Sequence, residues 1–326
     1  HITSQQDILR TVFTAAFLIL LGVVGVLSLV FSRYLTKPLE ELKKGSEAIG
    51  HGDLDYQVNV HTGDEFEDLS NSFNQMASDL KEHIRTLRLT TAENERIQKE
   101  LEIARGIQQS FLPESAPTIP GIDLEGFNLP AAEVGGDFYD FIPVGSTSWG
   151  LVIADVSGKG VPAALFMALS RTLIRASASR NPDPVASIRD ANRFICLDSK
   201  TSMFVTLFYA ILDIRNKTLT FINAGHNPPL LLHPGSDGIN LLKARGIALG
   251  VIDEVDLESV EVRLDHGDLV VLYTDGVTEA TDEHDREYGV ERLTSIIHKS
   301  RHLHAKEIIT SIVSDIAAFA GTRPQF

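Results

Sequence analysis

The sequence predicts an α+β fold that follows a membrane-spanning helix and a long helical connection. Segments rich in β-branched and aromatic residues follow one another closely between residues 203 and 233, a pattern that favours antiparallel strands joined by short turns. The predicted strands cover residues 149–156, 203–214, 217–225, 228–233 and 268–275. The predicted helices cover residues 161–178, 184–198, 289–299 and 304–319.

The composition is that of a folded, acidic protein. Of 326 residues, 43% are hydrophobic and 22% are charged, and the formal net charge is −15. This negative charge argues against a nucleic-acid partner, because a protein that binds nucleic acid must neutralise phosphates with Lys and Arg. The single cysteine, Cys196, allows no intrachain disulfide and no thiolate zinc cluster.

An uncharged apolar run, "VFTAAFLILLGVVGVLSLVF", extends from Val12 to Phe31. About 20 helical residues span roughly 30 Å of hydrocarbon, so we assign residues 11–32 to a transmembrane helix. Basic residues are more frequent after the run than before it, with Arg33, Lys37, Lys43 and Lys44 against Arg10. The positive-inside rule therefore places the rest of the chain in the cytoplasm, and we expect a sensor before His1.

Two short apolar repeats follow, separated by a glycine-containing connector. The first repeat comprises Leu35, Leu39, Leu42, Ser46 and Ile49, and the second comprises Phe66, Leu69, Phe73, Met76 and Leu80. Stripes of this kind must be buried against a second copy, which predicts a parallel homodimer. The segments "TKPLEEL" and "GDEFEDLSNSFNQM", with Pro38, Gly52 and Glu65, resemble a HAMP signalling domain, to which we assign residues 33–85.

The helical pattern continues to Pro113, with Ile97, Leu101, Ala104 and Gln108 along one seam. Three prolines, at 113, 117 and 120, then end the helix. We assign residues 86–112 to a coiled-coil linker that continues the dimer interface.

Carboxylates occur where apolar segments end. Asp137 and Asp140 lie in "GGDFYD", Asp155 in "IADVSGKG" and Asp275 in "LYTDGVTE". Strands that end in Asp bring carboxylates to one edge of a sheet, where Mg²⁺ or Mn²⁺ binds through oxygen ligands. Each Asp alone is equally compatible with a turn, since Asp-Gly is a common turn pair.

Four motifs in order make the prediction more specific: "EVGGDFYDF", "ADVSGKGVPAALFMA", "NAGHNPPLLL" and "LYTDGVTEA". Together with "ELEIARGIQQSFLP", they resemble the bacterial PPM-type serine/threonine phosphatases of the SpoIIE and RsbU kind, over about residues 97–320. The resemblance implies a sandwich of two antiparallel sheets flanked by helices. We expect this domain at residues 118–326, truncated at its C-terminus.

The resemblance also implies the site and its chemistry. Asp137, Asp155, Asp275 and the Val156 carbonyl would hold two Mn²⁺ or Mg²⁺ ions, which activate water to hydrolyse phosphoserine or phosphothreonine. The resemblance implies supporting roles for five further residues: Asp140, Lys159, Asn223, His226 and Gly276. Of these, Asp140 would accept a hydrogen bond from water at the metal.

Two features of the sequence depart from the family. Ser157 stands where eukaryotic relatives have a histidine, so no general acid is evident. A further Asp, in a "DD-x-T" motif, is expected after "GTRPQF", and without it we expect the second metal to bind poorly.

Other functions remain open at this point. A catalytically impaired domain used as a binding module would share the same motifs. A diguanylate cyclase would need Glu where Phe138 stands, and a histidine kinase would need further residues around His83 that are absent. The favoured prediction is a bacterial inner-membrane phosphatase, and the family resemblance implies that its substrate is a STAS-domain anti-sigma factor antagonist. The stimulus and the sign of regulation are not predicted.

Overall fold

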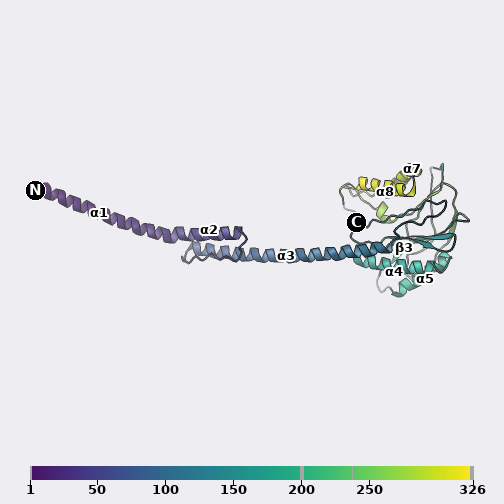
Figure 1. Ribbon diagram of the computed structural model, residues 1–326, viewed down its shortest axis with the longest axis horizontal. Coiled ribbons are helices and arrows are strands. Elements are labelled where there is room, and N and C mark those ends of the chain that lie inside the picture. The colour runs from purple at the N-terminus through teal and green to yellow at the C-terminus, as the bar shows by residue number, and fades with distance from the viewer. Residues whose placement is uncertain (1, 199–201, 237, 324–326) are drawn as a thin grey trace. The chain divides into compact units, whose positions relative to one another are not determined.

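The computed structural model describes residues 2–198, 202–236 and 238–323 (Figure 1). The chain divides into two compact units, His1–Ile97 and Gln98–Phe326, which are described separately. The last three residues of the predicted phosphatase domain, 324–326, lie outside the described residues.

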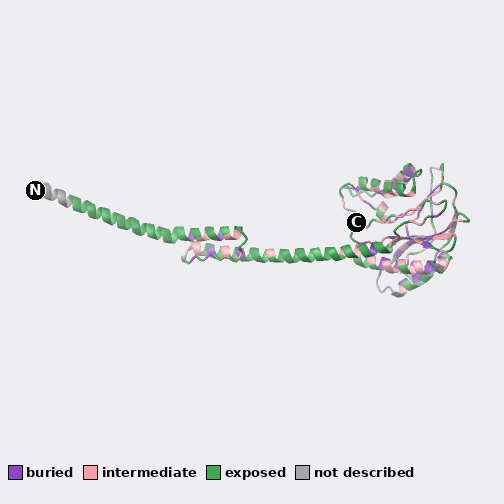
Figure 2. Cartoon of the chain, in the orientation of Figure 1, coloured by how far each residue is buried: buried purple, intermediate pink, exposed green. Residues whose placement is uncertain are grey.

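The N-terminal unit begins with helix α1 (Ile2–Phe31), followed by a π-helical turn η1 (Ser32–Thr36) and helix α2 (Lys37–Gly50). The described side chains of α1 are exposed along its length (Figure 2). The helical stretch that starts at Leu9 reaches a mean hydropathy of 2.6 and is long and apolar enough to cross a membrane. The predicted transmembrane helix, residues 11–32, lies within this stretch.

Residues 51–64 form a connector between α2 and helix α3 (Glu65–Phe111). The side chain of Asn74 accepts a hydrogen bond from the Val58 N–H and donates one to the Val58 carbonyl, each at 2.9 Å. Gly45 lets the connector pass closely, because a Cβ there would lie 2.3 Å from Val58 Cγ2. The connector is therefore fixed by both helices.

Several side chains of the two apolar repeats are exposed to solvent in the single chain. Five of them are between 41% and 62% exposed: Leu35, Leu39, Leu69, Met76 and Leu80. Exposed apolar side chains of this kind are common where a protein binds a partner, and the homodimer stays a prediction.

The C-terminal unit contains two antiparallel sheets. The first has the strand order β1-β2-β3-β4-β7, formed by β1 (Phe138–Pro143), β2 (Ser148–Val156), β3 (Val205–Asp213), β4 (Thr218–Ala224) and β7 (Val260–Arg263). The second has the order β6-β5-β8, formed by β5 (Leu230–Leu232), β6 (Ile239–Leu241) and β8 (Leu269–Val271).

Helices cover the outer faces of the two sheets. Helices α4 (Gly160–Ala178) and α5 (Pro184–Asp198) pack on the five-stranded sheet, and α7 (Gly289–Ser300) and α8 (Ala305–Ala320) lie on the opposite side (Figure 1). This is the predicted sandwich of two sheets between helix layers. A short helix, α6 (Asp275–Thr278), precedes α7.

Three groups of buried side chains hold the layers together. Phe208 and Phe221 fill the space between the sheets, where their rings stack with centroids 5.2 Å apart. Ala154 and Met167 belong to the group under α4 and α5, and Ile297 belongs to the group under α7 and α8. Both faces of the five-stranded sheet are thus buried.

The structure also contains elements that the sequence pattern did not predict. Strand β1 escaped prediction because Asp140 occupies one of its buried positions and interrupts the apolar alternation. Short β6 and β7 were missed as well. The strand predicted at 268–275 ends at Val271, since it pairs only with the three residues of β5, and Asp275 begins a helix instead.

The stacked pair between the sheets gives a stability prediction. Phe208→Ala should lower the free energy of unfolding of this unit by about 3–5 kcal/mol, because it leaves a cavity between the sheets. Urea unfolding can be followed by fluorescence of Trp149, the sole tryptophan, which lies in β2. The matched control is Phe194→Ala, since Phe194 is 49% exposed. Equal losses in the two variants would contradict the assigned core.

Candidate metal centre

The pairing of β1 with β2 brings two carboxylates together. Phe138 pairs with Ala154, so the residues just beyond this pair, Asp137 and Asp155, lie beside each other where the ladder ends. Their side chains are hydrogen-bonded to each other. Asp275, at the start of α6, is close enough for its charge to act on Asp155. The structure thus brings the three predicted catalytic carboxylates to one end of the sandwich.

The electrostatics of this cluster favour a cation. Burial raises the pKa of Asp155 to about 8, together with the hydrogen bond to Asp137 and the charges of Asp137, Asp275 and Glu279. Burial and the charge of Asp137 also raise the pKa of Asp275. Neighbouring negative charges disfavour ionisation of all three carboxylates at once, and a bound divalent cation would relieve their repulsion.

A main-chain oxygen completes the oxygen-rich surface. A Cβ on Gly136 would lie 2.7 Å from the Val156 carbonyl oxygen and 3.4 Å from Asp155 Oδ1, so only glycine lets the loop approach β2 this closely. Carboxylate and carbonyl oxygens are the ligands that Mg²⁺ and Mn²⁺ prefer, so the residues fit the predicted metals. Within the described residues, no three His, Cys, Asp or Glu side chains already stand at the spacing of a metal cluster. The assembled part is therefore the carboxylate pair and the carbonyl.

Polar side chains from distant segments hold Asp137 in place. Thr274 Oγ1 donates a hydrogen bond of 2.6 Å to Asp137 Oδ2. Asn128 Nδ2 donates a hydrogen bond of 2.9 Å to the main-chain oxygen of Asp137. Neither residue was singled out from the sequence, although Thr274 directly precedes Asp275 in the "LYTDGVTE" motif.

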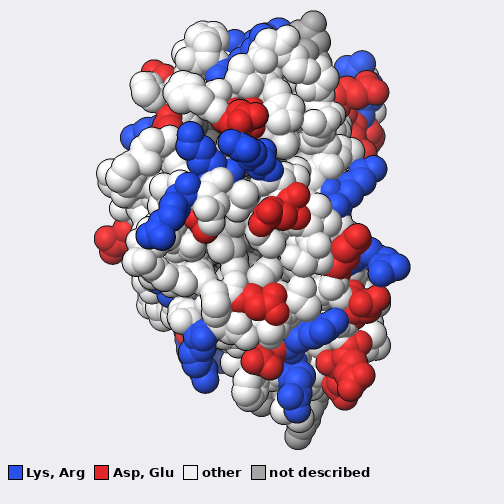
Figure 3. Space-filling model, turned by 90° about the vertical axis from the view of Figure 1, so that its right-hand side faces the viewer, with Lys and Arg blue, Asp and Glu red and all other residues white. Residues whose placement is uncertain are grey.

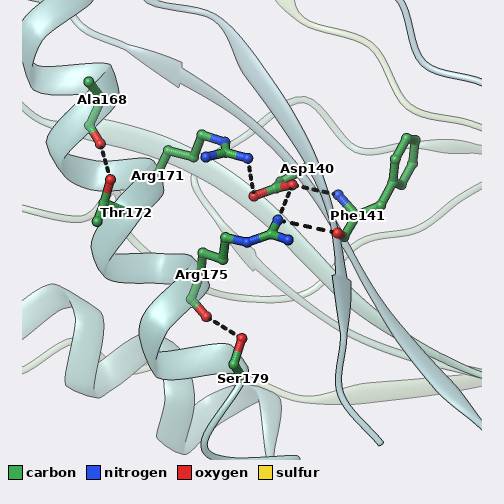
Figure 4. Close-up of polar contacts among 7 residues, drawn as sticks. All are labelled: Asp140, Phe141, Ala168, Arg171, Thr172, Arg175 and Ser179. Atoms are coloured by element: carbon green, nitrogen blue, oxygen red, sulfur yellow. Dashed lines mark hydrogen bonds and ion pairs between the residues drawn. The ribbon is translucent and has the colours of Figure 1, made fainter. Parts of the chain in front are cut away.

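Asp140 has a different environment, although it is only three residues from Asp137. Its side chain is 1% exposed, and Arg175 Nη1 donates a hydrogen bond of 2.6 Å to Oδ1. Arg171 Nη2 lies 3.0 Å from Oδ2, and Figure 4 shows both arginines reaching Asp140 from α4. In this structure Asp140 therefore fixes α4 to β1. Its predicted role as an acceptor for water at the metal stays a prediction.

Asn223, in β4, and His226, just after it, are connected to Asp155 through Thr206 of β3. The Asn223 side chain accepts a 2.7 Å hydrogen bond from the His226 N–H and donates one of 2.9 Å to the His226 carbonyl. His226 Nδ1 lies 2.9 Å from Thr206 Oγ1, which also contacts the main-chain oxygen of Asp155 at 3.4 Å. Burial lowers the pKa of His226 to about 4, so its ring is neutral near pH 7.

Lys159 and Gly276 surround Asp275. Lys159 is exposed just before α4, and its charge counteracts the rise in the pKa of Asp275. The Gly276 N–H makes a hydrogen bond to the Asp275 carboxylate, which acts in the same direction. Both predicted supporting residues thus lie next to the third carboxylate.

Two family models match the sequence. The model described as Stage II sporulation protein E (SpoIIE) matches residues 145–325. The HAMP domain model matches residues 30–82. Together they cover most of the chain.

The chain is also similar to curated proteins and solved structures. It is 34% identical to Protein IcfG of Synechocystis over 91% of this chain and 50% of that protein. It is 31% identical to the phosphoserine phosphatase RsbU of Bacillus subtilis over 68% of this chain and 65% of that protein. The chain thus spans half to about two thirds of the length of these relatives.

Solved structures support the fold. The SiaA-PP2C domain of Pseudomonas aeruginosa matches with a TM-score of 0.63 and 24% identity, over 72% of this chain and 94% of that one. The PP2C phosphatase domain of SpoIIE from Bacillus subtilis, with a fragment of its regulatory domain, matches with a TM-score of 0.50 and 22% identity, over 59% of this chain and 56% of that one.

The close approach at Gly136 can be tested directly. Gly136→Ala places a methyl group against the Val156 carbonyl, so we expect it to weaken Mn²⁺ binding by about tenfold or more. Isothermal titration calorimetry on the full chain in detergent measures this affinity. Gly145→Ala is the matched control, because a Cβ there meets nothing within 4 Å. Unchanged binding in Gly136→Ala would contradict the assigned site.

Proposed function

The chain belongs to the SpoIIE family of PPM-type phosphatases and carries a HAMP domain, and from this we propose that it hydrolyses phosphoserine or phosphothreonine on a partner protein. The observation that carries the proposal is the pairing of Asp137 with Asp155 beside the Val156 carbonyl. The proposed organisation is a transmembrane helix (11–32), a HAMP domain (33–85), a linker (86–112) and the phosphatase domain (118–326).

In the proposed mechanism, Asp137, Asp155, Asp275 and the Val156 carbonyl hold two Mn²⁺ or Mg²⁺ ions. When bound, such ions supply Lewis acidity, which makes water a nucleophile at neutral pH and neutralises charge on the phosphoryl oxygens. Thr274 and Asn128 keep Asp137 oriented toward Asp155, so these two ligands would need little rearrangement.

The proton for the departing serine or threonine oxygen has to come from outside the carboxylate cluster. Ser157 follows Val156, and its hydroxyl accepts a 2.9 Å hydrogen bond from the Phe204 N–H, which fixes the end of β2. His226 is buried and neutral, and its Nδ1 faces Thr206. We therefore propose that solvent water protonates the leaving oxygen.

The partner is proposed from the relatives and from the charge of the surface. RsbU is named a phosphoserine phosphatase, and the proposed substrate here is the phosphoprotein of a partner-switching pathway, a STAS-domain anti-sigma factor antagonist. Acidic and basic side chains intermix on the face of the C-terminal unit in Figure 3. The net charge of −15 and this mixed surface give no support to a nucleic-acid partner.

The N-terminal unit anchors and pairs the protein in this proposal. Helix α1 crosses the plasma membrane of a bacterium, with the later domains in the cytoplasm. The exposed apolar stripes of α2 and α3 pair with those of a second copy, which gives a homodimer through the HAMP domain and the linker.

Replacing Asp155 tests the function. Asp155→Asn removes a metal-binding charge, so Mn²⁺-dependent release of phosphate from a phosphoserine peptide should fall by on the order of a hundredfold. The exposed Asp190→Asn on α5 is the matched control and should keep its activity. Trp149 fluorescence checks that both variants are folded. Retained activity in Asp155→Asn would overturn the proposed mechanism.

A further inference from the structure

The last turn of α3 is attached to the loop that carries Asp137. Gln108 is only 7% exposed, and its Nε2 donates a hydrogen bond of 2.6 Å to the Gly135 carbonyl. The Gly135 N–H donates one of 3.1 Å to Gln108 Oε1. One side-chain amide thus satisfies both main-chain groups of Gly135. We call this pair of hydrogen bonds the Gln108 clamp.

The clamp lies immediately beside the candidate metal centre. Gly135 precedes Gly136, which touches the Val156 carbonyl and Asp155, and Asp137 follows. The residues between Pro130 and Phe138 form no strand or helix, so their position depends on side-chain contacts of this kind. A shift at Gly135 would therefore move Asp137 relative to Asp155.

The helix end itself is firmly placed. Leu112, one turn after Gln108, packs against the buried group under α4 and α5. The sequence pattern put Gln108 on a coiled-coil seam, whereas the structure buries it against its own C-terminal unit. The exposed large apolar side chains near this end of α3 include Ile103, Ile107 and Phe111.

We propose that Gln108 is a positioning residue that makes the geometry of Asp137 depend on the placement of α3. This inference rests on the proposed function in one respect, the assignment of Asp137 as a metal ligand. Two hydrogen bonds from one planar amide constrain direction as well as distance. A rotation of α3 by even part of the 100° that separates successive residues would break them.

The clamp also links the site to the N-terminal signalling segment along the chain. Helix α3 extends from Glu65 to Phe111 without a break, and the HAMP match ends at residue 82 within it. Helix rotation or a register shift is the kind of two-state change that can act at a distance. In the proposed coupling, such a change is transmitted to Asp137 through Gln108.

The test replaces the amide while keeping the shape of the side chain. Gln108→Met should weaken Mn²⁺ binding to the full chain in detergent, by calorimetry, by about tenfold or more. Gln109→Met, at the exposed neighbouring position, should stay within about twofold of the parent. Hydrogen exchange at the Gly135 amide should accelerate in Gln108→Met alone.

Three outcomes separate the interpretations. Faster exchange at Gly135 with unchanged Mn²⁺ affinity would overturn the proposal and leave Gln108 a purely structural residue. If Gln108→Met destabilises the protein, seen as a lower unfolding midpoint by Trp149 fluorescence, a second variant is needed. Gln108→Glu keeps the hydrogen-bond acceptor but loses the donor, and the proposal requires that it also weakens Mn²⁺ binding. Unchanged binding in that variant would also overturn the proposal.

The proposed function is tested separately by Asp137→Asn. If that variant binds Mn²⁺ like the parent chain, the ligand assignment is wrong, whatever Gln108 does. If Mn²⁺ binding depends on both Asp137 and Gln108 but the parent chain releases no phosphate, the positioning role stands and the phosphatase function fails.

Discussion

The structure depends on holding two carboxylates together against their mutual repulsion. Asp137 and Asp155 become neighbours because β1 and β2 pair in one register, and a slip by one residue would turn every side chain of β1 to the other face. Asp140 also attaches β1 to α4, since its buried carboxylate pairs with Arg171 and Arg175. Burial, followed by the hydrogen bond to Asp137 and the neighbouring negative charges, raises the pKa of Asp155, and a divalent cation would favour its ionised form.

The rest of the C-terminal unit makes this arrangement rigid. Two packed sheets and two helix layers position the strands, and the Asp137 loop is then held by Thr274, Asn128 and Gln108. Thr274 directly precedes α6, Asn128 lies in the segment before the loop, and Gln108 lies in α3. A site assembled from several segments is sensitive to movement of any of them.

Much of this fold could be predicted from the sequence, and the partners of the site residues could not. Asp137, Asp155 and Asp275 could be proposed as ligands because each lies in one of the family motifs, although Asp137 precedes β1 and does not end an apolar strand. The contacts of Gln108 and Thr274 were not, because they join residues separated by 27 and 137 positions, and no local pattern encodes them. Strand β1 was missed for a related reason. A buried Asp140 can be explained only by its ion pairs with two arginines on α4, which are distant in the sequence.

The central claim is that Asp137, Asp155 and the Val156 carbonyl surround a divalent cation. Anomalous diffraction at the manganese edge, from crystals of this chain grown with Mn²⁺, tests it most directly. The account predicts an anomalous peak within coordination distance, about 2–2.5 Å, of oxygen atoms from all three residues. Manganese bound elsewhere, with Asp137 and Asp155 still hydrogen-bonded to each other, would contradict it.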